Sequence, residues 1–186
     1  RLKTPESIVK KLKNDGCEVS IDNMVEHLND IAGIRIICSF MSDIYPIADM
    51  IARQADITVL HVKDYIKYPK TNGYKSYHMV VTIPVYLSEG KRDTKVEIQI
   101  RTIAMDFWAS LEHKIAYKFE GKAPDYLERE LKSCADMVDM LDMKMFSLNQ
   151  AIMAVEEEER RVEEEKRRER EKAEKRQEEL AGNGPT

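Results

Sequence analysis

Apolar and polar residues alternate along the chain with two different periods. Short runs rich in β-branched and apolar residues are typical of strands, and they occupy residues 31–40, 57–62, 77–87 and 94–102. Apolar residues with helical spacing occupy residues 5–14, 24–28, 43–54 and 103–119. The last two strand segments are joined by a short polar turn over 88–93, so they predict an antiparallel hairpin. The pattern therefore predicts strands and helices that share one core, followed by an appendage.

Two helix starts carry capping residues. Thr4, Pro5 and Glu6 are the order of an N-cap, a first helical position and an acid in the first turn. Ser20 or Asp22 can cap the second helix in the same way. We therefore expect the first helix to begin directly after Thr4.

Charged and polar residues are ordered on two of the predicted strands. The run 31–40 is mostly apolar and predicts a strand covered on both faces, yet Asp30 stands at its start and Arg35 inside it. A charge in a buried strand needs a partner or a ligand. In 96–102 the two-residue period turns Glu97, Gln99 and Arg101 to one face, opposite the apolar residues. An amphipathic edge strand with a wet face has the same pattern.

Residues 63–78 form a loop of unusual composition, with four lysines, four tyrosines and a histidine. Pro69 and Asn72-Gly73 are turn residues and exclude regular backbone there. Lysine suits phosphate, and a tyrosine ring suits a nucleotide base. A solvated basic turn would look similar, but this loop lies between an acidic strand start and a strand with a polar face. The sequence thus indicates a loop that binds phosphate and a base.

A heptad pattern begins after residue 126. Its apolar residues, at alternating steps of four and three, are Leu127, Leu131, Cys134, Val138, Leu141, Met145, Leu148, Ile152 and Val155. This predicts a helix that docks on its own domain and also contributes to an oligomer. Residues 156–180 are almost all Glu, Lys and Arg with favourable i,i+4 pairs, which predicts a solvated helical extension.

Composition narrows the function classes. The net charge of −4 over 186 residues argues against a protein that binds nucleic acid through its overall charge, so we expect no DNA partner. Three scattered cysteines without C-x-x-C spacing are against a disulfide framework and a zinc site, and they favour a reducing cytoplasm. No apolar run approaches the roughly 20 residues of a membrane span, and no signal peptide is evident. We expect a cytoplasmic protein without membrane contact.

The acids and the cations together suggest a reaction. Two carboxylates on neighbouring strands, Asp30 and Glu97, are the minimum set for holding Mg²⁺, which takes oxygen ligands and shares them with substrate phosphates. Lysines and arginines would clamp those phosphates. This implies phosphoryl-type transfer, in which the protein positions groups and neutralises charge. The sequence has no G-x-x-x-x-G-K-[ST], no kinase loop set and no G-x-G-x-x-G, so it would lack the common phosphate loops.

Five segments, in order, resemble the motifs of RelA/SpoT-type (p)ppGpp synthetases. They are Arg1-x-Lys3-x-x-x-Ser7, Asp30 to Arg35, Lys63 to Ile66, Pro69 to His78 and Glu97 to Thr102. The resemblance covers about residues 1–120 and leaves no room for a hydrolase domain, so the chain is similar to the small alarmone synthetases. It implies an α+β fold: a mixed, largely antiparallel sheet flanked by helices, as in nucleotidyltransferases, with a C-terminal helical extension.

The resemblance also implies an activity and a role for each matching residue. The pyrophosphoryl group of ATP would pass to the ribose 3′-hydroxyl of GDP or GTP, making (p)ppGpp for the bacterial stringent response. Asp30 would bind Mg²⁺, and Glu97 would be a second metal ligand or the base that activates the 3′-hydroxyl. The ATP side would comprise Arg1, Lys3, Ser7, Lys11 and Arg35, with the two arginines around the adenine. The acceptor side would comprise Lys63, Lys70, Tyr74, Lys75, His78, Gln99 and Arg101, with Tyr74 stacked on the guanine.

The expected organisation has three parts. A synthetase domain would occupy residues 1–122, a heptad-patterned helix for packing and oligomerisation would occupy 123–155, and a charged solvated helix with a flexible tail would occupy 156–186. The resemblance implies a homotetramer, and RNA stays open as a regulator. Two departures from the family pattern leave the choice between GDP and GTP open: His61 where the long synthetase-only enzymes have Arg, and Lys75 where many relatives have Gln.

A rival hypothesis is a catalytically idle module that binds guanine nucleotides or single-stranded RNA, because a basic, tyrosine-rich loop also suits base stacking. The carboxylates of Asp30 and Glu97 are against it, since they would repel phosphate unless a metal lay between them.

Overall fold

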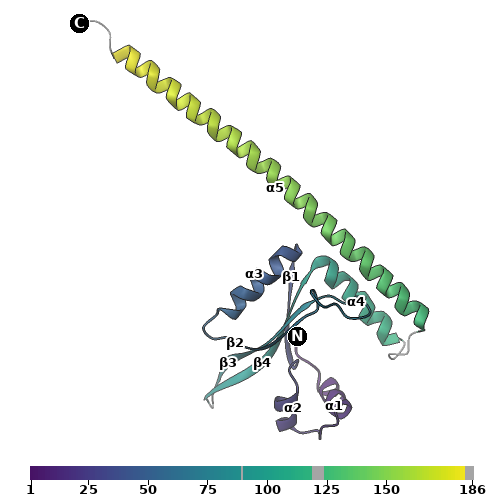
Figure 1. The fold of residues 1–186 in the computed structure, drawn as a ribbon. Helices are drawn as coiled ribbons and strands as arrows, with labels where there is room; N and C mark the ends of the chain where they lie inside the picture. The colour runs from purple at the N-terminus through teal and green to yellow at the C-terminus, as the bar shows by residue number, and fades with distance from the viewer. Residues whose placement is uncertain (89, 119–123, 183–186) are drawn as a thin grey trace. The chain divides into compact units, whose positions relative to one another are not determined.

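The computed structural model describes residues 1–88, 90–118 and 124–182, and the side chains of 116–118, 175 and 177–182 are outside the description. The expected helical residue Phe119 also lies outside it. Residues Arg1–Met143 form one compact unit and Lys144–Thr186 form another. Figure 1 gives the order of the elements.

The first unit is built on a four-stranded sheet with the order β1-β4-β3-β2. The strands are β1 (Ala32–Cys38), β2 (Thr58–Asp64), β3 (Tyr77–Leu87) and β4 (Gly90–Thr102). β1 runs parallel to β4, while β2, β3 and β4 are antiparallel neighbours. The predicted mixed, largely antiparallel sheet is therefore confirmed.

The predicted hairpin is present, but its turn is shorter than expected. β4 begins at Gly90, which pairs with Leu87, so residues 90–93 belong to the strand and not to the turn. Gly90 has a φ of 121°, a value that favours glycine. Strand pairing therefore extends into a polar segment in which composition alone indicates a loop.

Five helices lie among the described residues, and their ends follow the sequence signals. They are α1 (Pro5–Asn14), α2 (Ile21–His27), α3 (Met41–Ala52), α4 (Ile103–Lys118) and α5 (Asp125–Gly182). The Thr4 side chain accepts a hydrogen bond from the amide of Ser7 at 3.3 Å, and Ser20 accepts one from Asn23 at 3.1 Å. These contacts confirm the predicted start of the first helix and show that Ser20, and not Asp22, is the N-cap of the second helix.

The two faces of the sheet have opposite character. On one face, α3 contributes Ile44 and Ala48 to a core shared with Met79 and Ile98 (Figure 1). Apolar residues of β4 occupy alternate positions on this face, as the two-residue period predicts. The opposite face therefore carries the polar row of β4, and that is where the candidate site lies.

The prediction that the first strand is covered on both faces is wrong, because β1 lies at the edge of the sheet and has exposed apolar side chains. Ile34 is 51% exposed and Ile37 is 44% exposed. A short segment before α1 runs beside the free edge: the Lys3 amide donates to the Ile31 carbonyl at 2.8 Å, and the Gly33 amide donates to the Arg1 carbonyl at 2.8 Å. A long apolar run does not distinguish an edge strand from a central one. The pairing of the N-terminal segment with β1 brings Arg1 and Lys3 to the start of that strand.

The first part of α5 packs on α4 through a face that differs from the predicted heptad seam. Leu131 and Val138 lie against Trp108, whose indole N–H donates to the Leu131 carbonyl at 3.1 Å. The other buried positions are Ala135 and Asp142, in place of Cys134 and Leu141, which are exposed. Leu131 and Val138 belong to the predicted seam, and Ala135 and Asp142 each lie one residue after a predicted seam position, so the buried stripe keeps the seven-residue repeat but is turned slightly about the helix axis.

The part of α5 in the second unit has a largely exposed surface. Its exposed apolar side chains are Met145, Leu148, Ile152, Met153, Val155 and Val162. Ion pairs one turn apart join Glu164 to Arg168 at 4.0 Å and Arg167 to Glu171 at 3.7 Å. Each such exposed pair stabilises a helix by only about 0.3–0.5 kcal/mol. Within the described part of the chain, no helix is long and apolar enough to cross a bilayer.

Candidate active site

An open cleft of about 600 Å³ lies at the polar face of the sheet, near the start of β1. It is lined by Arg1, Lys3, Ser7, Asp30, Gly33, Ile34, Arg35, Glu97, Gln99 and His113. Four of the five residues expected on the ATP side are in this set, together with both predicted carboxylates. The fold explains this grouping, because Gly33 pairs with Glu97 and Arg35 pairs with Gln99 across the parallel β1–β4 ladder.

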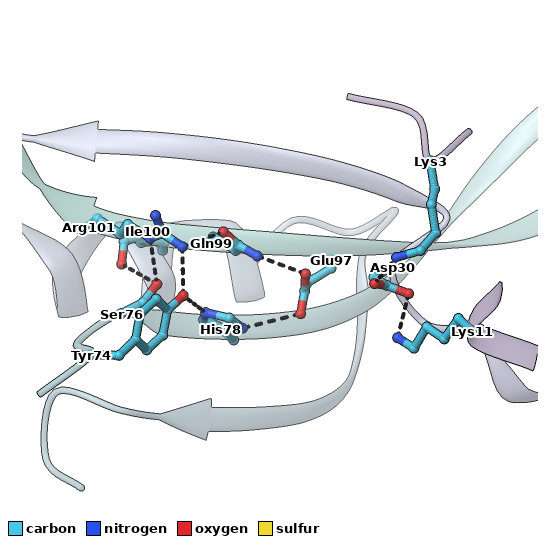
Figure 2. Close-up of polar contacts among 10 residues, drawn as sticks. All are labelled: Lys3, Lys11, Asp30, Tyr74, Ser76, His78, Glu97, Gln99, Ile100 and Arg101. Carbon is cyan, nitrogen blue, oxygen red and sulfur yellow. Dashed lines mark hydrogen bonds and ion pairs between the residues drawn. The ribbon is translucent and has the colours of Figure 1, made fainter. Parts of the chain in front are cut away.

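Asp30 is held by two lysines at one end of the cleft (Figure 2). The Lys3 ammonium lies 2.5 Å from Oδ2, and the Lys11 ammonium lies 2.8 Å from Oδ1. Burial alone would raise the pKa of Asp30, but the hydrogen bonds and charges of Lys11 and Lys3 outweigh it and lower the pKa. Asp30 is therefore ionised at neutral pH, and Lys11 belongs to the site although it does not line the cleft.

Glu97 lies in a closed ring of hydrogen bonds with four other side chains (Figure 2). Its Oε1 is 3.2 Å from His78 Nδ1, and its Oε2 accepts from Gln99 Nε2 at 2.9 Å. His78 Nε2 is 2.8 Å from the Tyr74 hydroxyl. Arg101 Nη2 closes the ring by donating to the Tyr74 hydroxyl at 2.6 Å and to Gln99 Oε1 at 2.8 Å.

The ring has one consistent direction for a neutral His78. The Tyr74 oxygen accepts from Arg101, so its own proton points to His78 Nε2, and Nδ1–H then donates to Glu97. The hydrogen bond from His78 is the largest influence on the pKa of Glu97 and lowers it; burial and the charge of Asp30 work against this, and the bond from Gln99 adds to it. The Glu97 carboxylate is thus ionised and oriented by two donors.

Tyr74 is partly enclosed by its neighbours. Its ring lies 5.8 Å from the Tyr65 ring and 5.9 Å from the His78 ring, both edge to face. Two cations approach it: Lys70 Nζ at 4.9 Å and the Arg101 guanidinium at 5.2 Å from the ring centroid. The ring is therefore suited to stacking on a planar group, but two cations already lie over it.

Comparisons with known proteins show which family the chain belongs to. A family model described as "Region found in RelA / SpoT proteins" matches residues 1–122. The chain belongs to the RelA/SpoT family.

Within the family, the chain is a small alarmone synthetase by similarity along most of its length. It is 50% identical over 152 residues to GTP pyrophosphokinase YwaC of Bacillus subtilis, which covers 82% of this chain and 72% of that protein. The structure of B. subtilis small alarmone synthetase 1 bound to its product pppGpp is similar with a TM-score of 0.76 and 36% identity, over 81% of this chain and 76% of that one. Another structure of that enzyme, bound to AMPCPP, has a TM-score of 0.68 and 32% identity, over 82% and 75% of the two chains.

The acceptor-side residues predicted for this RelA/SpoT chain fall into two groups. Tyr74, His78, Gln99 and Arg101 belong to the ring around Glu97, and Gln99 also lines the cleft. Three lysines lie elsewhere. Lys63 is exposed on β2 opposite His78, and Lys70 is exposed beside the Tyr65 and Tyr74 rings. Lys75 Nζ pairs with Asp139 of α5 at 2.5 Å.

Three residues at the site are not among those predicted from the sequence, and one of them, His113, lines the cleft. Ser76 is fully buried and accepts a hydrogen bond from Arg101 Nε at 3.2 Å. Asp106, in the first turn of α4, pairs with Arg101 at 3.1 Å and with Arg35 at 3.0 Å. A signal existed for Asp106, because an acid five residues after a strand arginine and inside the next helix can fold back on it. Among the described residues, no cluster of three or more His, Cys, Asp or Glu side chains is placed to hold a metal ion.

Proposed function

We propose that this chain transfers the β,γ-pyrophosphoryl group of ATP to the ribose 3′-hydroxyl of GDP or GTP, with release of AMP and formation of (p)ppGpp. The observation that carries the proposal is the single cleft that contains Asp30, Glu97 and the cations Arg1, Lys3 and Arg35. The similarity to enzymes named GTP pyrophosphokinase and to a synthetase bound to pppGpp supports the same reaction.

On the donor side, Lys3 and Lys11 are the proposed ligands of the ATP phosphates, with the Ser7 hydroxyl beside them. In the structure both lysines pair with Asp30. Phosphate oxygens accept the same hydrogen bonds, so a bound triphosphate would take over the two ammonium groups with little loss of ion pairing. Arg1 and Arg35 are the proposed sandwich for the adenine, because a planar guanidinium stacks on a base.

Asp30 and Glu97 fit a Mg²⁺ ion by the chemistry of their donor atoms. Both offer ionised carboxylate oxygens to one cleft, and Mg²⁺ is bound through one or two carboxylates plus substrate phosphates. When bound, Mg²⁺ would supply positive charge against the phosphate oxygens. The pKa values of both acids are lowered, so neither has to lose a proton to serve as a ligand at neutral pH.

The environment of Glu97 favours the ligand role over the base role. A general base works best with a pKa near the working pH, whereas the His78 hydrogen bond lowers the pKa of Glu97. Glu97 can still accept a hydrogen bond from the 3′-hydroxyl and orient it toward the β-phosphorus. Tyr74 is the proposed stacking surface for the guanine, with Lys70 and Lys63 as candidates for the acceptor phosphates.

The test is a product assay with ATP, Mg²⁺ and either GDP or GTP, followed by chromatographic separation of the nucleotides. Wild type should form the 3′-pyrophosphorylated product together with AMP. Asp30→Asn and Glu97→Gln should each lower the rate by roughly 10²–10⁴-fold, the usual cost of a lost metal or proton-transfer group. Product formation at the wild-type rate by either variant would refute the catalytic assignment.

We also propose that the chain forms a homo-oligomer, a tetramer by family resemblance, through α5. The apolar side chains Leu148, Ile152 and Val155 continue the heptad steps and are about half exposed. Such a row is unusual on a monomer surface unless a partner covers it. Light scattering of the full chain tests the proposal, and a monomer at micromolar concentration would contradict it.

A further inference from the structure

Arg101 is a buried cation whose donors are used inside the protein. Its side chain is 5% exposed. Its Nε donates to Ser76 at 3.2 Å, its Nη1 donates to Asp106 at 3.1 Å, and its Nη2 serves Tyr74 and Gln99. A guanidinium held in this way holds its neighbours in position and has little surface left for a substrate phosphate.

A buried charge needs a counter-charge, and Arg101 has one that it shares. Among the described residues, its only ion pair is with Asp106. The same atom, Asp106 Oδ1, lies 3.0 Å from Nη1 of Arg35, which lines the cleft and is about half exposed. One carboxylate oxygen therefore joins a cation of the donor side to a cation that organises the acceptor side.

We infer that Asp106 is a positioning residue that couples the two nucleotide sites, because its Oδ1 holds Arg35 and Arg101 at once. The names donor side and acceptor side rest on the proposed function, whereas the contact of Asp106 Oδ1 with both arginines is observed in the structure. Arg101 is then also a positioning residue, which holds the Tyr74 hydroxyl and Gln99 on the acceptor side.

The coupling has a direction. A nucleotide that stacks its base on Arg35 draws that guanidinium toward the cleft, which leaves Asp106 Oδ1 to Arg101. The ion pair between Arg101 and Asp106 is stronger when Arg101 is the one cation at that oxygen than when two cations compete for it. Arg101 then holds Tyr74 and Gln99 more firmly, so the acceptor binds to a better ordered site. Donor and acceptor should therefore bind with positive cooperativity, and the coupling must be reciprocal.

Calorimetry on the full chain tests this without turnover. The Kd of GDP is measured with Mg²⁺, first alone and then with saturating AMPCPP, an ATP analogue that cannot transfer its pyrophosphoryl group. In wild type, AMPCPP should lower the Kd of GDP by about fivefold or more, the range of typical coupling. In Asp106→Asn the factor should fall to within about twofold of unity. If that variant does not fold, Asp106→Glu, which keeps the charge and moves it, should also lose most of the factor.

The matched control is Asp49→Asn, which removes a carboxylate paired with Arg53 at 2.7 Å on the exposed surface of α3. It should keep the wild-type factor. An Asp106 variant that retains the full factor, or a wild type in which AMPCPP leaves the Kd of GDP unchanged, would overturn the inference. A wild type that couples the two nucleotides but forms no product in the ATP assay would refute the proposed reaction and leave the coupling standing.

Discussion

Gly73 lies where the acceptor loop meets α5, and replacing it with alanine would disturb two features at once. Its φ is +88°, in the left-handed region that favours glycine. A Cβ on this residue would overlap the Cβ of Ala135, because the two atoms would lie closer than non-bonded carbon atoms can approach. Ala135 belongs to the buried stripe of α5, so it cannot turn aside.

The expected cost follows from these two observations. A left-handed conformation costs a non-glycine residue about 1–2 kcal/mol, and forcing an extra methyl into a packed contact costs about 1–3 kcal/mol. Gly73→Ala should therefore lower the free energy of unfolding by about 2–5 kcal/mol. Because the next residue is Tyr74, the KM for GDP should rise more than the KM for ATP.

Urea unfolding measures the first effect, and a matched control separates the two costs. Gly16 has a φ of +72° with no atom within 4 Å of an added Cβ, so Gly16→Ala should cost only the conformational part. The double variant Gly73→Ala/Ala135→Gly removes the clash and should show a favourable interaction energy of about 1–3 kcal/mol in a double-mutant cycle. Equal destabilisation by Gly16→Ala and Gly73→Ala, with no interaction in the cycle, would refute the packing argument.

Three other predictions concern charge. The pKa of Asp142 is raised, first by burial and also by the charge of Asp139. At pH values above the ordinary pKa of 3.8, the ionised carboxylate therefore destabilises the fold. Asp142→Asn, which keeps an acceptor for Thr102, should raise the Tm at pH 7 and not at pH 3. The lowered pKa of Glu97 acts in the opposite sense. The stability that its carboxylate contributes is present at pH values above the ordinary pKa of 4.5 and is lost as the pH falls through the pKa of the folded state. Glu97→Gln should therefore lose less stability than wild type in acid unfolding scans, and identical scans would contradict this. Deleting residues 156–186 should leave activity intact because the predicted site residues all lie before residue 102, and it should leave the oligomer intact because Leu148, Ile152 and Val155 are kept. Loss of either in activity and light-scattering assays would give the charged helix a role.

The sequence was most informative where geometry repeats locally. The two-residue period of a strand places Glu97, Gln99 and Arg101 on one face, and the hydrogen bonds that join them follow from that alternation. Capping at Thr4 was equally local. The predicted polar turn after β3 is longer than the observed one because paired strands can include polar residues, and composition does not reveal pairing.

The errors and omissions arise from contacts between distant segments. Lys75 is expected on the acceptor side, and the sequence does not reveal that its ammonium pairs with Asp139, which lies 64 residues away on α5. The exposure of Ile34 depends on which strands flank β1, and an apolar run does not carry that information. Asp106 lies in the first turn of α4, and only the fold brings both Arg35 and Arg101 to its Oδ1.

The two halves of the site are held together by different interactions, and this difference bears on how substrates enter. Asp30 is held by two lysines that are partly exposed, and phosphate oxygens can replace its carboxylate as their partner. The ring around Glu97 is satisfied internally and contains a buried guanidinium, so opening it would leave donors unpaired at about 1–3 kcal/mol each. Lys70, by contrast, is exposed over the Tyr74 ring, and a cation–π contact at an exposed site is worth only about 0.5–1 kcal/mol. A guanine would therefore displace Lys70 from the ring face and leave the Tyr74 hydroxyl in the network, so that the base binds against a surface already fixed in position.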